Sequence, residues 1–265
     1  MNILVTSDDG IFAEGLWALV EELRKIAQVV VAAPDKGHLA MGTAVSDIDR
    51  KPLRLKKVRP VIPEVETYCI KGTPVDSVIL ALCKLIQGRI DLIISGINRG
   101  TNVETDVFAS GTVGAALLGH LLRGLPALSI SLDRGDKLHF DVAAKLAAVL
   151  ASRIESGALP NNIFLNVNLP NLPLTEIKGI KITYLANGVY TDTVEEGYDE
   201  KGIYFQTKRY RGNKATDEGT DLWAVQQGYI SIVPLHSFVY PMFNKPSPHI
   251  PDSIWSHIMQ ELQRT

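Results

Sequence analysis

Short apolar segments that alternate with helix-forming stretches limit the fold of this chain more than any other feature. Ile3–Thr6, Gln28–Ala33 and Asp91–Gly96 are dominated by apolar and β-branched residues, which favour strands. Between the first two lies Glu14–Ile26, which has the pattern of an amphipathic helix. Strands that are apolar on both faces are typical of parallel sheets covered by helices on both sides. The sequence therefore predicts an α/β protein in three layers around a mostly parallel sheet.

Later segments continue this alternation. Pro126–Leu132 predicts a further strand and Phe140–Ile154 an Ala- and Leu-rich helix. Ile163–Leu169 alternates apolar and polar residues, which predicts a strand near an edge of the sheet or half exposed to solvent. No chemistry is assigned to Asn166 or Asn168 in that strand.

The pattern changes after residue 170. Strand-like segments at Ile180–Leu185, Gly202–Arg209 and Tyr229–Val233 are separated by polar, Gly-containing loops instead of long helices. This pattern predicts antiparallel hairpins that project from the core, where subunits often meet. The acidic stretch Asp192–Glu200 is expected to be mobile, solvated surface. We expect a catalytic core over residues 1–170, followed by an oligomerisation extension over residues 171–265 whose terminal helix packs back on the core.

Composition narrows the class of partner. The chain has 265 residues, of which 46% are hydrophobic and 21% charged, and a net charge of -2. This balance argues against a broad nucleic-acid-binding surface and offers no electrostatic attraction to a membrane. Cys69 and Cys83 are the only cysteines, too few for a disulfide framework or a cysteine-based zinc site. With no signal-like N-terminus and no apolar run near the roughly 20 residues of a spanning helix, a cytoplasmic location is expected.

Two adjacent carboxylates follow the first strand. Asp8 and Asp9 come directly after Thr6-Ser7, and Gly10 then allows the backbone to turn. Ligands of open α/β sheets bind at the carboxyl ends of the strands, and neighbouring anionic groups there repel unless a cation or a proton intervenes. Oxygen ligands suit Mg²⁺, Mn²⁺ or Ca²⁺. The alternative is that one of the carboxylates only caps the following helix.

Two further loops carry residues that suit metal or phosphate binding. Asn98 and Asn102 follow the strand at Asp91–Gly96, and Asn can cap a turn or offer its carbonyl oxygen to a metal or its amide to a phosphate. Ser110-Gly111-Thr112 begins a helix over Val113–Leu122, where free N–H groups and hydroxyls favour an anion. An ordinary N-cap is the alternative. The combination of acidic ligands after one strand and an anion-binding helix start after another favours a functional site.

Two other polar groups have simpler explanations. Thr73-Pro74-Val75-Asp76 has the residues of a helix N-terminus, with Thr73 as the cap and Asp76 at the favourable third position. His236 follows a strand end, and a single His is more often a packed or surface residue than a catalyst. No site role is assigned to these residues.

Taken together and in order, these stretches resemble the SurE family of survival-protein nucleotidases. The motifs that carry the resemblance are Ser7-Asp8-Asp9-Gly10, Ala33-Pro34-Asp35, Gly72-Thr73-Pro74-Val75-Asp76, Ser95-Gly96-Ile97-Asn98-Arg99-Gly100-Thr101-Asn102, Ser110-Gly111-Thr112-Val113 and Gly228-Tyr229-x-Ser231-x-x-Pro234-Leu235. They span almost the whole chain. The resemblance implies a Rossmann-like, doubly wound core with a C-terminal β-hairpin that swaps between subunits in homodimers or homotetramers. It also implies a metal-dependent phosphatase that acts on 5′- and 3′-nucleoside monophosphates.

The resemblance also implies roles for particular residues. By analogy Asp8, Asp9 and Asn98 bind one divalent metal, Mg²⁺ or Mn²⁺, with Ca²⁺ as a substitute in crystals, and the two carboxylates are the catalytic residues. The residues expected to bind the phosphate are Asn102, Ser110, Gly111 and Thr112. Asp8 is the candidate to accept the proton of the attacking water. A covalent aspartyl-phosphate is the weaker alternative.

The sequence departs from the family pattern at two positions. Leu39 stands where the family usually has a metal-binding Ser, so the loop either bends differently or recruits Thr43 or Ser46. Ser7 stands where the family usually has Asn, which replaces one supporting hydrogen bond by a shorter one. A competing hypothesis based on Leu39 is a homologue that binds nucleotides but turns them over weakly or not at all. A dinucleotide-dependent enzyme is disfavoured because no Gly-rich turn follows the first strand.

Overall fold

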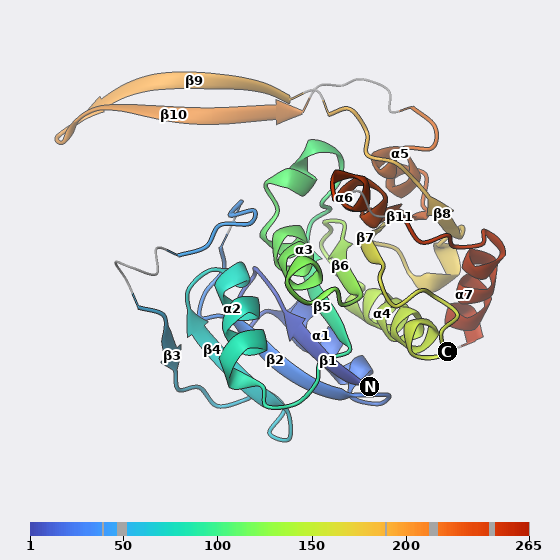
Figure 1. The fold of residues 1–265 in the computed structure, drawn as a ribbon. Helices are drawn as coiled ribbons and strands as arrows, with labels where there is room; N and C mark the ends of the chain where they lie inside the picture. The colour runs from blue at the N-terminus through green and yellow to red at the C-terminus, as the bar shows by residue number, and fades with distance from the viewer. Residues whose placement is uncertain (39, 47–51, 189, 212–216, 244–246, 265) are drawn as a thin grey trace.

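The computed structural model describes residues 1–38, 40–46, 52–188, 190–211, 217–243 and 247–264 (Figure 1). Within these residues the chain forms a nine-stranded sheet with the order β3-β4-β2-β1-β5-β6-β7-β11-β8. Its strands are β1 (Asn2–Thr6), β2 (Gln28–Pro34), β3 (Arg54–Lys56), β4 (Glu66–Lys71), β5 (Leu92–Arg99), β6 (Ala127–Leu132), β7 (Phe164–Leu169), β8 (Ile180–Ile182) and β11 (Ile230–Pro234). The six strands from β4 to β7 in this order are parallel, whereas β3 and β11 run antiparallel to β4 and β7.

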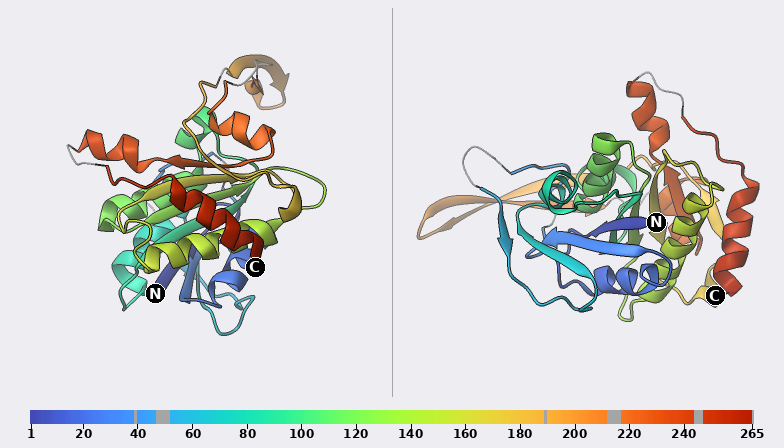
Figure 2. Two further views of the ribbon diagram at one scale, coloured as in Figure 1. Left: turned by 90° about the vertical axis from the view of Figure 1, so that its right-hand side faces the viewer. Right: turned by 60° about the horizontal axis from the view of Figure 1, so that its bottom comes forward.

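Helices cover both faces of the sheet (Figures 1 and 2). The α-helices are α1 (Glu14–Leu23), α2 (Pro74–Leu80), α3 (Gly111–Arg123), α4 (Phe140–Glu155), α5 (Asp221–Gln226), α6 (His236–Met242) and α7 (Ser253–Arg264), and the short helical turns are η1 (Ala81–Leu85), η2 (Glu104–Phe108) and η3 (Leu174–Glu176). In β1, Ile3 and Val5 pack with α1 and α4, while Leu4 packs on the other face with α2 and α3. The predicted α/β fold with a mostly parallel sheet is confirmed.

The strand order places a crevice beside β1. The chain passes from β1 to β2 on one side and later returns to form β5 on the other side of β1. In doubly wound sheets, such a reversal separates the loops at the carboxyl ends of the two strands and opens a ligand site between them. Asp8 and Asp9 lie in the loop after β1, and Asn98 lies at the carboxyl end of β5.

The position predicted for β7 is wrong. β7 pairs with β6 on one side and β11 on the other, and all six of its residues are buried. The alternating polar residues, Asn166 and Asn168, are fully buried because they form hydrogen bonds inside the protein. An alternating pattern distinguishes the two faces of a strand but does not show that the polar face meets water.

The chain after residue 170 contributes both to the sheet and to a hairpin. β8 and β11 are the last two strands of the nine-stranded sheet. The apolar side chains Trp255, Ile258 and Leu262 of α7 are buried in the same core cluster as residues of α4. β9 (Tyr190–Asp199) and β10 (Gly202–Arg211) form a separate two-stranded antiparallel hairpin that extends away from the body (Figure 1). The expected solvated surface at Asp192–Glu200 is confirmed for residues 193–200, which are almost all exposed, but the expectation of a mobile loop is wrong, because Asp192–Asp199 pair with β10.

Local capping explains the start of α2. The Thr73 hydroxyl accepts a hydrogen bond from the Asp76 N–H at 3.0 Å, and Asp76 Oδ2 accepts one from the Thr73 N–H at 2.7 Å. This reciprocal pair satisfies two of the N–H groups that a helix start leaves open. The predicted cap is confirmed. The other end of the predicted helix continues as the π-helical turn η1.

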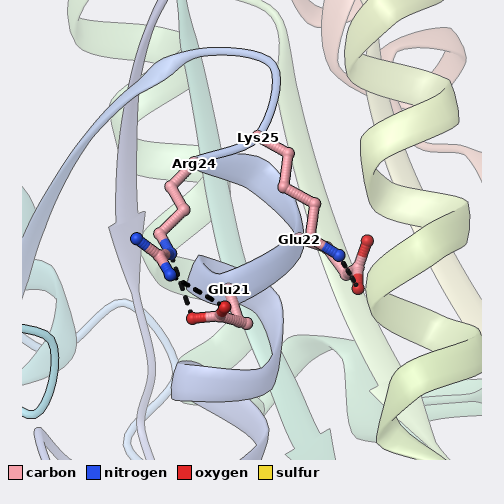
Figure 3. Close-up of polar contacts among 4 residues, drawn as sticks. All are labelled: Glu21, Glu22, Arg24 and Lys25. Atoms are coloured by element: carbon pink, nitrogen blue, oxygen red, sulfur yellow. Dashed lines mark hydrogen bonds and ion pairs between the residues drawn. The ribbon is translucent and has the colours of Figure 1, made fainter.

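The solvent-facing end of α1 carries two ion pairs, Glu21–Arg24 and Glu22–Lys25 (Figure 3). Exposed pairs of this kind contribute little to stability, so the buried apolar face of α1 holds the helix in place. The N-cap of α1 is Ala13, whose side chain makes no cap hydrogen bond. The alternative in which Asp8 or Asp9 caps this helix is therefore wrong. In the described part of the chain, no helix is long and apolar enough to cross a membrane.

Candidate active site

The residues predicted from the first strand and the later loops meet at one cavity of about 650 Å³. The cavity lies at the carboxyl ends of β1 and β5, beside the start of α3. The predicted residues among those that line it are Asp8, Asp9, Asn98, Asn102 and Ser110. Gly111 and Thr112 contact Asp8 at the edge of this group. The structure thus brings together seven residues from three separate parts of the chain.

Asp8 is held by the first turn of α3. Its Oδ2 accepts a hydrogen bond from the Thr112 N–H at 3.1 Å, and its Oδ1 accepts one from the Thr112 hydroxyl at 2.6 Å. A carboxylate at a helix N-terminus is stabilised by the helix dipole and by the free N–H groups. Burial nevertheless raises the pKa of Asp8 to about 6, with the neighbouring Asp9 charge adding to the rise and the Thr112 hydrogen bonds opposing it. Asp8 thus joins β1 to α3.

Asp9 connects β1 to the end of β5. Its Oδ2 accepts a hydrogen bond from the Arg99 N–H at 3.2 Å, and its own N–H donates to Ser7 Oγ at 3.2 Å. Burial raises the pKa of Asp9, and the Arg99 N–H and guanidinium partly offset that rise. Ser7 therefore contacts the backbone of Asp9 and not its carboxylate.

The turn after Asp9 requires glycine. Gly10 has φ 96°, and a Cβ there would lie 2.9 Å from the Lys36 carbonyl carbon. The loop after β2 also contacts the acidic turn, because the His38 N–H donates to the Asp8 carbonyl oxygen at 2.7 Å. The backbone of Asp8 and Asp9 is therefore fixed on both sides.

Asn98 lies in the ladder at the end of β5, and Asn102 lies in the loop that follows this strand. Asn98 Nδ2 donates to the Gly100 carbonyl oxygen at 2.7 Å, which leaves the carbonyl oxygen of its side chain as the ligand-type atom. Asn102 Nδ2 donates to Ser131 Oγ at 2.8 Å, and its backbone is bound by Asn166 and Asn168. The sequence analysis assigned no chemistry to Asn166 and Asn168. Two Asn on the same face of an apolar strand are nevertheless a signal of buried polar contacts.

The start of α3 lies against Asp8. Ser110 is the N-cap, and its hydroxyl accepts a hydrogen bond from the Val113 N–H at 3.1 Å. Gly111 leaves no space for a side chain, since a Cβ there would lie 3.0 Å from Asp8 Cβ. The capping alternative for Ser110 is therefore present, and Ser110 brings the start of the 13-residue helix α3 to the cavity wall.

The structure describes only some of the residues considered as a further metal ligand, namely Leu39 and its possible substitutes Thr43 and Ser46. Leu39 lies outside the described residues. Thr43 and Ser46, the proposed substitutes, are not among the residues that line the cavity. Ser46 instead donates its N–H and hydroxyl to Asp76, at 3.0 and 2.5 Å.

The donor set is made of oxygen atoms. Among the described residues no group of three or more His, Cys, Asp and Glu side chains is arranged to hold a metal. Two carboxylates and an amide oxygen suit a hard cation such as Mg²⁺ or Mn²⁺, which usually retains several waters. The set fits such an ion and disfavours a zinc site built from His and Cys.

The cavity also contains charges that the sequence did not single out. These are Arg99, Asp106, Asp133 and Arg134. Arg134 lies over Gly100, where a Cβ would be 3.2 Å from its Nε atom. Arg99 lies within a quoted motif but was given no role there. Asp106, Asp133 and Arg134 lie outside the motifs, and only the folding of separate segments brings them to the cavity.

These features define a Rossmann-like α/β protein with an oxygen-lined pocket at the reversal of its sheet and a helix N-terminus at the pocket wall. The family model described as "Survival protein SurE" matches residues 3–192. The chain belongs to the SurE family.

Similar proteins extend the match over nearly the whole chain. The 5′-nucleotidase SurE of Dehalococcoides mccartyi strain CBDB1 is 45% identical, and the match covers 92% of this chain and 92% of that protein. The 5′-nucleotidase SurE of Actinobacillus succinogenes is 40% identical, and the match covers 89% of this chain and 92% of that protein. The crystal structure of the SurE protein from Aquifex aeolicus superposes with a TM-score of 0.74 at 34% identity, over 89% of this chain and 93% of that chain. The family resemblance predicted from the motifs is confirmed.

Proposed function

We propose that this protein is a metal-dependent 5′-nucleotidase that hydrolyses nucleoside monophosphates and also accepts 3′-nucleotides. Family membership and the shared name of its relatives support nucleotidase activity. The observation that carries the proposal is the convergence of Asp8, Asp9 and the start of α3 on one cavity. Carboxylates that bind a cation and helix N–H groups that bind an anion suit a phosphate ester between them.

Asp8, Asp9 and Asn98 are the proposed metal ligands. A divalent ion held there would neutralise phosphate charge and activate a water. The hydrogen bonds from Thr112 to Asp8 and from Arg99 to Asp9 fix the direction of both carboxylates before any ligand arrives.

Asn102, Ser110, Gly111 and Thr112 are the proposed phosphate ligands. The N–H groups at a helix start hold phosphate oxygens without a side-chain charge. In the structure both donor groups of Thr112 contact Asp8, so its contribution to phosphate binding competes with its support of Asp8. Asp8 is the proposed acceptor of the water proton, and an aspartyl-phosphate on the same side chain is the weaker alternative.

A phosphate-release screen tests this proposal. Purified protein is treated with a chelator and then assayed on 5′- and 3′-nucleoside monophosphates with Mg²⁺, Mn²⁺ or Ca²⁺ added singly. We expect no release without metal and recovery with Mg²⁺ or Mn²⁺. Full activity in the presence of excess chelator would contradict metal dependence, and release from unrelated phosphate esters alone would contradict the nucleotide substrate.

Leu39 defines a competing possibility, a weakly active protein that binds nucleotides. On this alternative, calorimetry detects AMP binding while the release assay stays near background at every metal concentration. Leu39→Ser would then raise turnover by at least about tenfold, since it restores a hydroxyl ligand. An active wild type whose turnover is unchanged by Leu39→Ser rules this alternative out.

We further propose that the β9–β10 hairpin assembles the protein into homodimers or homotetramers. By register, the same face of the hairpin carries four apolar side chains that are each at least 61% exposed: Val194, Tyr198, Ile203 and Phe205. Glu196 and Thr207 also lie on this face by register, but most of it is apolar. The opposite face carries the Lys208–Glu195 ion pair. An exposed, mostly apolar face on a projecting element indicates a protein interface.

Phe205→Asp is expected to shift the protein towards monomer, because the charge must be desolvated in an apolar interface. The change is measured by sedimentation velocity over a range of concentrations. Gln206→Asp is the matched control, since it adds the same charge on the opposite face of the same strand. An assembly that persists in Phe205→Asp, or a wild type that is monomeric throughout, contradicts the proposal.

A further inference from the structure

The backbone of Asn102 is bound by two side chains from β7. Asn168 Oδ1 accepts a hydrogen bond from the Asn102 N–H at 2.7 Å, and Asn168 Nδ2 donates to the Asn102 carbonyl oxygen at 3.0 Å. Asn166 Nδ2 donates to the same carbonyl oxygen at 2.8 Å. Both β7 side chains are fully buried, and Asn102 lines the cavity. One residue of a loop is thus held at both of its peptide groups.

The Asn168 side chain forms the two backbone hydrogen bonds that a neighbouring strand would otherwise form with Asn102. A side-chain amide has the same donor and acceptor as a peptide group, so one Asn can pair with the N–H and the carbonyl of a single residue. The chain has left the β5 ladder at Asn102, since β5 ends at Arg99. Ladder hydrogen bonds no longer fix the loop at that point, and the Asn168 amide supplies the equivalent pair of bonds.

The side chain of Asn102 is fixed by the same region of the sheet. Its Nδ2 donates to Ser131 Oγ in β6. Asn166 is itself oriented by Ser129, whose hydroxyl donates to Asn166 Oδ1 at 2.9 Å. Buried polar groups that satisfy one another rigidify their surroundings, whereas one left without a partner destabilises the protein. The network is therefore a rigid support directly behind the cavity wall.

We propose that Asn166 and Asn168 are positioning residues that set Asn102 for phosphate binding. The inference rests on the proposed role of Asn102 as a phosphate ligand and extends it to two residues that do not line the cavity. Their hydrogen bonds reach Asn102 and not Asp8 or Asp9, so they act on the phosphate side of the site and leave the metal side unchanged.

The test compares phosphate and metal affinity in the same variants. Calorimetry measures the Kd of Mn²⁺ and then the Kd of inorganic phosphate with Mn²⁺ present. Asn168→Ala and the milder Asn166→Ala are expected to weaken phosphate binding by about tenfold and to leave the Mn²⁺ Kd unchanged, as is typical when a supporting hydrogen bond is lost. Tyr240→Phe is the control, because it removes the hydrogen bond from the Tyr240 hydroxyl to the Asn162 carbonyl oxygen without touching Asn102, Asn166 or Asn168.

A double-mutant cycle separates positioning from stability. If the β7 residues act through the Asn102 side chain, Asn168→Ala added to Asn102→Ala lowers the unfolding midpoint but weakens phosphate binding no further. Additive loss of phosphate affinity, unchanged affinity in both single variants, or a parallel loss of Mn²⁺ affinity overturns the inference. A wild type that binds phosphate but does not hydrolyse AMP refutes only the proposed function, and one that binds no phosphate refutes both.

Discussion

Asp8→Asn is expected to lower Mn²⁺-dependent release of phosphate from AMP by on the order of 10³-fold, equivalent to about 4 kcal/mol of transition-state stabilisation. The amide keeps the size of the carboxylate but loses its charge and one of its acceptor oxygens. Asp8 also accepts two hydrogen bonds from Thr112, so the variant loses part of the link between β1 and α3. The measurement is steady-state turnover at saturating Mn²⁺.

Asp91→Asn is the matched control for this prediction. Asp91 precedes β5 at the opposite end of the sheet, where its Oδ2 accepts a hydrogen bond from the Asn2 N–H at 2.9 Å. The same chemical change there is expected to reduce stability slightly and to leave turnover within about twofold of wild type. Unchanged turnover in Asp8→Asn, or an equal loss in both variants, would contradict the assignment of Asp8.

Gly111→Ala is expected to lower kcat/KM by about 10²-fold, because a displacement of about 1 Å in a catalytic group has an effect of this size. The new Cβ would lie 3.0 Å from Asp8 Cβ and 3.1 Å from its Oδ2. Asp8 cannot move away without weakening its bonds to Thr112, the next residue of the helix. The stability cost is expected to be about 1–3 kcal/mol, as for other overpacked sites.

Gly88→Ala controls for the general effect of replacing glycine. A Cβ at Gly88 meets no atom within 4 Å, and its φ is not in the left-handed region. Activity and the free energy of unfolding are both expected to stay near wild type. Wild-type kcat/KM in both Gly111→Ala and Gly88→Ala would contradict this prediction. The close packing of α3 against Asp8 would then have no part in catalysis.

Local patterns predicted the elements that depend on local physics. The apolar segments gave the strands β1, β2 and β5, and Thr73 with Asp76 gave the start of α2. The acidic pair at Asp8 and Asp9 also indicated that a cavity lies at the carboxyl ends of the strands, because parallel strands end together.

Contacts between distant residues explain what the sequence could not predict. Thr112 and Asp8 are 104 positions apart, so their hydrogen bonds leave no trace in either motif. The sequence predicts a half-exposed β7 because the hydrogen-bond partner of Asn168 is Asn102, 66 positions earlier, and β7 is flanked by both β6 and β11. The pairing of β9 with β10 was hidden by the acidic composition of β9, since cross-strand pairing does not require apolar residues on both faces.

The central claim is that one pocket holds a divalent metal and a phosphate group side by side. Crystals grown with Mn²⁺ and inorganic phosphate test it directly through the anomalous scattering of Mn²⁺. The predicted result is a manganese peak at about 2.0–2.3 Å from oxygens of Asp8, Asp9 and Asn98, with phosphate against the first turn of α3. Manganese bound elsewhere, or phosphate bound in this pocket with no metal beside the two carboxylates, would contradict the account.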